Sequence, residues 1–179
     1  MEGFMDEMID VLDSKTGAKT GEIISKNEAH KNGVWHGSIH LLIVNKDKTK
    51  TLLQKRCADK KLYPNTWDIA VGGHISSGED AKISVERELE EELGLNPNDY
   101  KIEFLTSVKE SLINGGVNSN EFVHIFIIYD DININEITLQ KEEVSGVKWV
   151  DKNELNYFID NNLMLPHVEE YKILNEILK

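Results

Sequence analysis

The chain has 179 residues, of which 40% are apolar and 29% are charged. This length and composition predict one globular domain with a buried core and exclude a largely disordered chain. The formal net charge of −12 opposes binding to phosphate backbones and to anionic lipid surfaces. We therefore expect neither a nucleic-acid polymer nor a membrane as a partner.

The expected cellular location follows from the cysteine count and the N-terminal segment. The single cysteine, Cys57, cannot close an internal disulfide, and residues 1–13 lack the basic start of a secretion signal. No apolar run approaches the roughly 20 residues that span a bilayer. We expect a soluble protein of the cytoplasm.

In chain order, residues 1–35 predict an extension that contains a short hairpin around Lys15-Thr16-Gly17 and a helical turn near 25–31. Apolar, β-branched and aromatic residues then predict strands at 39–44, 51–57, 67–71, 102–108, 121–129 and 146–150. Helical spacing and end signals predict helices at 80–93, 152–161 and 168–178. The pattern indicates a mixed α/β layer structure in one domain, divided into the extension 1–35, a core at 36–155 and a C-terminal helix at 156–179.

The most informative segment runs from Gly73 to Leu95 and reads GHISSGEDAKISVERELEEELGL. At about 100° per residue, the carboxylates of Glu88, Glu91 and Glu92 share one sector of the predicted helix. Like charges on one face repel each other, and a divalent cation would convert that cost into a binding site. Carboxylate oxygens favour Mg²⁺, with Mn²⁺ as the alternative ion. For an isolated helix of this composition, the alternative is an acidic face in solvent.

The spacing within this segment resembles the Nudix box, G-x5-E-x7-R-E-U-x-E-E-x-G-U, where U is a bulky aliphatic residue. Every fixed position is matched, by Gly73, Glu79, Arg87, Glu88, Leu89, Glu91, Glu92, Gly94 and Leu95. At average residue usage, a chance match in this chain is on the order of 10⁻⁷. The resemblance implies the Nudix-type α/β/α sandwich with a mixed central β-sheet. It also implies hydrolysis of a nucleoside diphosphate linked to another group, X.

The same resemblance implies a role for each polar box residue. Glu91 and Glu92 are expected to bind the metal, with Glu88 as a further ligand or as the base that deprotonates the attacking water. The carbonyl group of the residue at Gly72 is often a ligand in this family. The two remaining charged positions are expected to form a structural pair, Glu79 with Arg87.

Residues upstream of the box are similar to those of type 1 isopentenyl-diphosphate isomerases, which share the Nudix fold. The resemblance places Arg56 and Lys60 where those isomerases hold the substrate diphosphate; ordinary surface cations are the alternative. The essential isomerase cysteine is replaced by Gly72 and one carboxylate by Ser119, whereas the catalytic glutamate is retained as Glu121. Hydrolysis needs only metal, water and a base, so these replacements favour a hydrolase.

The isomerase resemblance also implies a second metal site. In those enzymes three histidines and two glutamates hold a divalent metal, and here His30, His36, His74 and Glu121 occupy corresponding positions. Four such ligands suit Zn²⁺ or Mn²⁺. The alternative is a set of packed or hydrogen-bonded histidines.

Together these features predict a Mg²⁺-dependent Nudix pyrophosphohydrolase that cleaves a small-molecule diphosphate by attack of water on phosphorus. An isopentenyl-diphosphate isomerase and a catalytically silent diphosphate-binding module are the alternatives. We expect X to be selected by variable loops such as residues 111–120. Dimers are common in the family, so a homodimer is a further expectation.

Overall fold

The computed structural model describes residues 6–179 and begins with the predicted hairpin. Strands β1 (Met8–Leu12) and β2 (Lys19–Ser25) pair in antiparallel fashion. The Asp13 carboxylate accepts hydrogen bonds from the backbone N–H groups of Lys15 and Thr16, which fixes the turn between the strands. Helix α1 (Lys26–Asn32) follows, capped by the Ser25 hydroxyl group. The predicted hairpin and helical turn are therefore confirmed.

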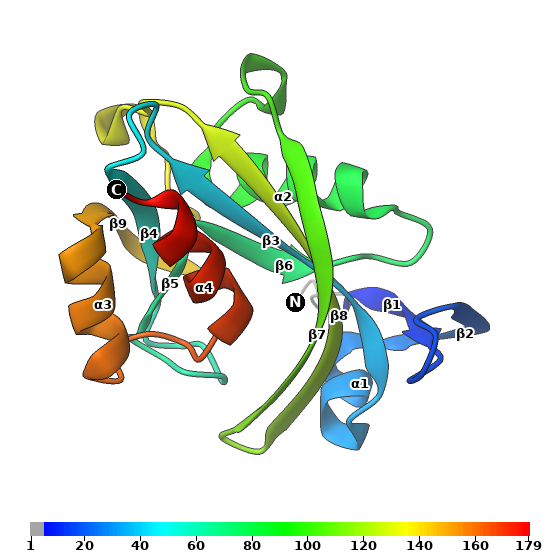
Figure 1. Cartoon of the computed structure of the whole chain (residues 1–179). Coiled ribbons are helices and arrows are strands. Elements are labelled where there is room, and N and C mark those ends of the chain that lie inside the picture. The colour runs from blue at the N-terminus through cyan, green and yellow to red at the C-terminus, as the bar shows by residue number, and fades with distance from the viewer. Residues whose placement is uncertain (1–5) are drawn as a thin grey trace.

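A seven-stranded mixed sheet forms the centre of the molecule (Figure 1). Its strands are β3 (Trp35–Val44), β4 (Lys50–Arg56), β5 (Trp67–Ile69), β6 (Val71–His74), β7 (Glu103–Asn114), β8 (Val117–Tyr129) and β9 (Val144–Asp151). The order is β5-β4-β3-β8-β7, with β6 also paired to β3 and β9 to β4. Strands β3 and β8 run parallel, whereas the other pairs are antiparallel.

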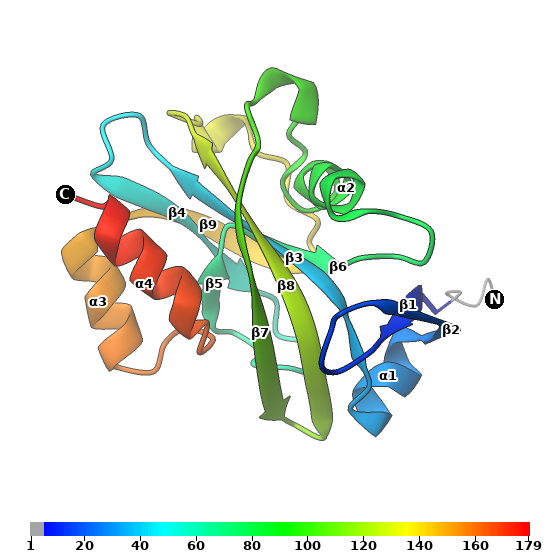
Figure 2. The same ribbon diagram turned by 45° about the vertical axis from the view of Figure 1, so that its right-hand side comes forward.

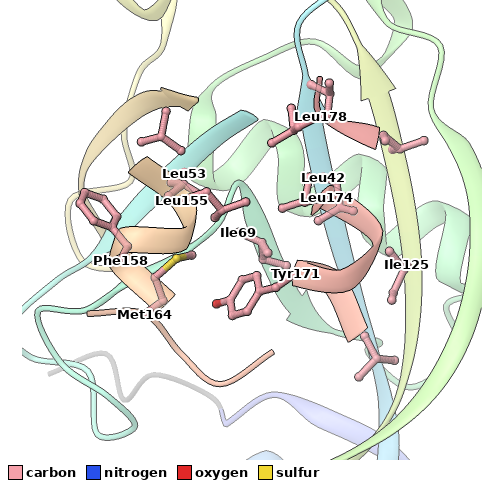
Figure 3. Packing of buried hydrophobic residues seen from close by; sticks show 14 residues of the cluster. Leu42, Leu53, Ile69, Ile125, Leu155, Phe158, Met164, Tyr171, Leu174 and Leu178 are labelled. Carbon is pink, nitrogen blue, oxygen red and sulfur yellow. The ribbon is translucent and has the colours of Figure 1, made fainter. Parts of the chain in front are cut away.

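Helices cover both faces of this sheet (Figure 2). Helix α2 (Ala81–Leu93) lies on one face, and helices α3 (Lys152–Asp160) and α4 (Val168–Ile177) lie on the other. Alternate residues of β3 enter the two cores, Ile39, Leu41 and Ile43 toward α2, and Leu42 and Val44 toward α3 and α4. The second core is shown in Figure 3. The predicted α/β/α sandwich with a mixed sheet is confirmed.

Short 3₁₀ turns and the chain's C-terminal part complete the fold. The turns lie at Pro97–Asp99 and Ile134–Glu136. Residues 156–179 do not form one C-terminal helix, because they contain the end of α3, a connecting segment and α4. Within the described residues 6–179, no helix combines the length and apolar character needed to cross a membrane.

The single strand predicted at 67–71 is wrong. The chain forms two strands there, because β5 pairs with β4 whereas β6 pairs with β3, and Ala70 lies between them. Strand β6 continues through Gly72 and Gly73 to His74, so the first glycine of the box and the glycine before it lie in the sheet. This change of partner brings the start of the box beside the centre of β3.

The loop predicted at 111–120 is also wrong, since it is the end of a long hairpin. Strands β7 and β8 stay paired as far as Asn114 and Val117, and the turn between them holds Gly115 and Gly116 at positive φ. The alternating serine and asparagine residues are polar, but the backbone ladder satisfies their N–H and C=O groups. Glu121 therefore lies inside β8 instead of at the beginning of a strand.

Candidate active site

Helix α2 carries the acidic residues of the box and has defined ends. The Asp80 side chain caps it by accepting a 2.9 Å hydrogen bond from the N–H of Ile83, and Gly94 ends it at a positive φ of 65°. Val85, Leu89 and Leu93 are buried against the sheet. This packing turns the sector of Glu88, Glu91 and Glu92 toward a cavity of about 880 Å³, which all three line.

Two of these three carboxylates are buried. Glu91 is exposed, whereas Glu88 and Glu92 are only 9% and 5% exposed. Burial raises the pKa of Glu88, although the neighbouring Arg87 guanidinium opposes this. Burial, reinforced by the charge of Glu88, raises the pKa of Glu92 well above its ordinary value. Buried carboxylates of like charge need a cation, so this donor set fits a divalent metal such as Mg²⁺.

The two glycines of β6 bring the backbone close to these carboxylates. The Gly72 N–H lies 3.4 Å from Glu92 Oε2, which also accepts a 2.9 Å hydrogen bond from the Gln54 amide group. A Cβ atom added at Gly73 would lie 2.2 Å from the Glu88 carboxyl carbon. Only glycine fits at position 73 while the Glu88 side chain keeps this place.

Arg87 joins the loop before α2 to the helix. Its Nε lies 3.2 Å from both carboxylate oxygens of Glu79, so the structure brings the expected pair together. Its Nη1 donates to Glu88 at 2.7 Å, and its Nη2 donates to the His74 carbonyl oxygen at 3.1 Å. Arg87 thus links the loop, the helix and the end of β6.

The two cations expected to bind the diphosphate both line the cavity. Arg56 Nη1 donates to Asp68 at 3.2 Å, and its Nη2 donates to the Leu62 carbonyl oxygen at 2.8 Å. Lys60 forms an ion pair with Glu143. Both cations therefore already have partners within the protein, and a bound diphosphate would compete with them.

The three histidines and Glu121 of the expected second metal site lie together, and all but the fully buried His36 line the same cavity. One ligand atom from each of His30, His36, His74 and Glu121 lies within 4.8 Å of the others. Nε2 of His30 is 3.1 Å from Nε2 of His74, and Glu121 Oε1 is 3.7 Å and 3.8 Å from Nε2 of His74 and His36. The Ser119 hydroxyl group donates to Glu121.

The electrostatics of this histidine group also fit a cation. Burial, followed by the like charge of His74, lowers the pKa of His30 to about 4. Burial alone would raise the pKa of Glu121, but the nearby His74 and His36 lower it well below its ordinary value. Within residues 6–179, the buried Nε2 of His36 has no hydrogen-bond partner. Clustered imidazole nitrogens, an ionised carboxylate and an unsatisfied ring nitrogen suit a transition-metal ion.

The structure also shows a second group of polar residues that the sequence analysis did not identify. His167 lies between two carboxylates, with Nε2 3.1 Å from Asp68 Oδ1 and Nδ1 2.8 Å from Glu110 Oε1. Nδ1 of His40 lies 2.5 Å from Glu170 Oε1. We call these five residues the inner polar group. His40 and Glu170 are 130 positions apart in the sequence, so no local spacing could have indicated their contact.

Opposite charges hold the inner polar group together. Burial alone would lower the pKa of His167, but the charges of Asp68 and Glu110 raise it well above its ordinary value. Burial would likewise raise the pKa of Asp68, but His167 and Arg56 bring it to about 2. One nitrogen of His40 and one of His167 lie within 4.8 Å of a Glu110 oxygen. Both ring nitrogens of His167 already face carboxylates. Hydrogen bonding within the group therefore explains these short distances without a bound metal ion.

Comparison with known proteins identifies relatives of two kinds. The chain is 40% identical over 158 residues to Nudix hydrolase 3 of Arabidopsis thaliana, covering 86% of this chain and 20% of that much longer protein. It is 35% identical over 163 residues to an uncharacterized Nudix hydrolase of Clostridium acetobutylicum, covering 88% and 76% of the two chains. An isopentenyl-diphosphate Delta-isomerase of Dinoroseobacter shibae is 31% identical over 137 residues, covering 74% and 73%.

Solved structures and a family model agree on the fold. The protein DR0079 of Deinococcus radiodurans aligns with a TM-score of 0.74 at 18% identity, over 97% of this chain and all of that one. A MutT protein of Methanosarcina mazei aligns with a TM-score of 0.62 over 79% and 94%. The NUDIX domain model matches residues 35–171. These findings confirm the family predicted from the box, and this chain belongs to the Nudix family of diphosphate-bond hydrolases.

Proposed function

We propose that this protein is a Mg²⁺-dependent pyrophosphohydrolase that cleaves a nucleotide or cofactor diphosphate by attack of water on phosphorus. The proposal depends on the two buried carboxylates, Glu88 and Glu92, which lie beside the backbone of Gly72 and Gly73 in a cavity large enough for a small molecule. Glu91, Glu92 and the Gly72 carbonyl group would hold the ion. Mg²⁺ bound there supplies positive charge that offsets the charge gathering on the diphosphate oxygens.

The other residues of the cavity position the substrate and move a proton. Arg56 and Lys60 would bind diphosphate oxygens, which requires exchange of their present partners Asp68 and Glu143. Either Glu88 or Glu121 accepts the proton of the attacking water, and both line the same cavity. Arg87 on α2 donates to Glu79 and so fixes the loop that precedes the helix.

The isomerase is kept as a second candidate because of one observation. His30, His36, His74 and Glu121 come together as the isomerase resemblance implied, and they would hold Zn²⁺ or Mn²⁺. Gly72 offers no thiol, however, and Ser119 offers no carboxylate. Isomerisation requires proton addition and proton removal at carbon, so the lost thiol favours hydrolysis.

A screen of diphosphates, with isopentenyl diphosphate included, tests the two candidates. The two phosphate-containing products of diphosphate cleavage and any allylic isomer are measured separately, with Mg²⁺ and with EDTA. We expect Mg²⁺-dependent cleavage into these two products and no isomer. Turnover that persists in EDTA would contradict the metal-dependent mechanism, and metal binding without turnover of any diphosphate would support the silent module.

Two expectations about the protein's context also remain proposals. The first is a homodimer, which light scattering coupled to size-exclusion chromatography measures directly. The second is a cytoplasmic location, which cell fractionation would test. The substrate class, a small molecule and not a nucleic-acid polymer, agrees with the net charge of −12.

A further inference from the structure

The inner polar group forms part of the wall of the same cavity as the box carboxylates. His40, Asp68, Glu110 and His167 line that cavity. Glu170 lies behind His40 and is fully buried. Any substrate that places its diphosphate at Glu88 and Glu92 therefore has these side chains on another wall of its binding site.

The inner polar group lies on the face of the sheet opposite to α2. His40 alternates with Ile39 and Leu41, which pack against α2, so its side chain points to the opposite face of the sheet. Helix α4 covers that opposite face (Figure 2). Gly72 pairs with His40 in the β3–β6 ladder. A Cβ atom added at Gly72 would lie 3.5 Å from Cδ2 of the His40 ring, so the absent side chain leaves this ring edge uncovered.

Two polar groups of this wall are available to hydrogen-bond a ligand. Nδ1 of His40 lies 2.5 Å from Glu170, whereas Nε2 of the same ring has no hydrogen bond within residues 6–179. The Glu110 side chain remains 14% exposed and has lone pairs beyond its contact with His167. In contrast, both ring nitrogens of His167 already face carboxylates.

The charge of the group selects between classes of ligand. The three basic side chains of this wall, Arg56, His40 and His167, are each paired with a carboxylate of the group. A second anionic substituent would compete with those carboxylates, and a hydrocarbon would remove Glu110 and His40 from water without replacing their hydrogen bonds. A neutral group with several hydroxyl groups, each of which can donate and accept, would satisfy both side chains.

We infer that the inner polar group is a subsite for a neutral polyhydroxylated substituent, such as a sugar, with Glu110 and His40 Nε2 as its hydrogen-bond partners. The inference rests on the proposed function, because it assigns X of the diphosphate substrate. Glu170 is a positioning residue, since it orients His40 and does not reach the ligand. A hydrocarbon X, such as an isoprenoid chain, is excluded from this subsite by the same chemistry.

Two matched pairs of ligands test the inference. Binding is measured by calorimetry with glucose 1-phosphate and n-hexyl phosphate, which have equal carbon counts but differ in hydroxyl groups. Hydrolysis is measured with UDP-glucose and the n-hexyl ester of UDP. We expect glucose 1-phosphate to bind at least tenfold more tightly than n-hexyl phosphate. We expect the same direction of preference in kcat/KM.

The variant that removes the hydrogen-bonding ring is His40→Leu combined with Glu170→Leu, which replaces a buried polar pair by two apolar side chains of similar size. It should reduce the preference for the hydroxylated ligand at least tenfold, mainly through Kd and KM. His40→Gln keeps a hydrogen-bonding group at this place and should retain most of the preference. His124→Leu is the matched control, because His124 is a half-buried histidine bonded to Ser107 outside the cavity.

The two measurements separate this inference from the proposed function. Equal binding of both phosphates to the wild-type protein, or an unchanged preference in the folded double variant, would overturn the subsite. Circular dichroism measures whether the double variant is folded. If it is not folded, the single variant His40→Leu replaces it in the test. A loss of preference in that variant supports the subsite, and an unchanged preference overturns it. Absence of hydrolysis together with selective binding of glucose 1-phosphate would reject the proposed function and retain the subsite.

Discussion

Single residues of β6 determine how close the sheet comes to the box carboxylates. Gly73 has no room for a side chain beside Glu88, whereas Gly72 has ordinary contact distance to His40 on the other side. Successive residues of a strand point to opposite faces, so Gly73 faces the box carboxylate Glu88 and Gly72 faces the inner polar group. These two positions therefore respond differently to substitution.

Replacing Gly72 by cysteine restores the side chain that the isomerases have at this position. We expect Gly72→Cys to fold, because the new Cβ lies at 3.5 Å from the His40 ring. Isomerisation of isopentenyl diphosphate should stay undetectable, since Ser119 cannot supply the missing carboxylate. Proton NMR of the products measures this, and formation of dimethylallyl diphosphate by either protein would contradict the expectation.

A substitution of Glu92 that removes only its charge tests the proposed metal site. Glu92→Gln keeps the shape of the side chain but removes its charge, so kcat should fall roughly 10³-fold in Mg²⁺. Stability in EDTA should not decrease, because the raised pKa of Glu92 shows that its buried charge is unfavourable. The control is Glu90→Gln, on an exposed position of the same helix. Near wild-type turnover of a folded Glu92→Gln protein would show that Glu92 is not a ligand of the catalytic metal.

At the scale of elements, the N-terminal hairpin supports the loop that leads into α2. Ile9 is fully buried and forms an isolated bridge with Ser76. The Ser77 N–H donates to the Met8 carbonyl oxygen at 2.8 Å. The hairpin thus packs on the segment that Arg87 and Glu79 hold from the other end.

Because Ile9 is buried, replacing it should measurably change the free energy of unfolding. Ile9→Ala should lower the free energy of unfolding by about 2–4 kcal/mol through the lost packing and the cavity left behind. Ile23→Ala, in the partner strand, is the control, because Ile23 is 52% exposed and should change stability by less than about 0.5 kcal/mol. Urea unfolding of the wild type and the two variants measures these changes in stability. Equal stabilities of the three proteins would show that the hairpin does not unfold together with the rest of the domain.

His167, just before α4, connects this helix to β5 and β7 through Asp68 and Glu110. Because its folded-state pKa is raised, the unfolded chain loses this proton near pH 6.5 while the folded protein keeps it. Its contribution to stability is therefore complete below about pH 6.5 and is lost as the pH rises through the folded-state pKa.

His167→Gln should abolish this pH dependence. Between pH 6.5 and 9, the free energy of unfolding of the wild type should fall more steeply than that of the variant, by up to about 1.4 kcal/mol per pH unit. Urea unfolding at four pH values measures the slopes. Parallel slopes would show that His167 carries no extra proton in the folded state.

At the scale of the whole molecule, four separate elements contribute one residue each to the group of three histidines and Glu121. His30 comes from α1, His36 from β3, His74 from β6 and Glu121 from β8. We expect His36→Ala and His74→Ala each to lose one Zn²⁺ or Mn²⁺ per chain, measured by elemental analysis after dialysis against trace metal. His124→Ala should keep the wild-type content. Unchanged metal content in the two site variants would leave packed histidines as the explanation.

The parts of the fold that the sequence predicted are those with local signals. The four-residue repeat of Val85, Leu89 and Leu93 defined α2 and, with it, the sector of the carboxylates. The inner polar group has no such signal, because its members lie on separate strands and on the segment around α4. The polar ends of β7 and β8 were mistaken for a loop, since their pairing depends on the partner strand and not on hydrophobic alternation.

The parallel pairing of β3 with β8 has a consequence for synthesis and folding. Trp35 pairs with Asn120 and Val44 with Tyr129, so every pair in this central ladder joins residues 85 positions apart. Such pairs have a high contact order and form only after a large loop has closed. On the ribosome, β3 and the box helix are made well before their shared partner β8 emerges. The catalytic cavity should therefore assemble late, with the hydrophobic run of β3 dependent on chaperones or early hairpin contacts until β8 arrives.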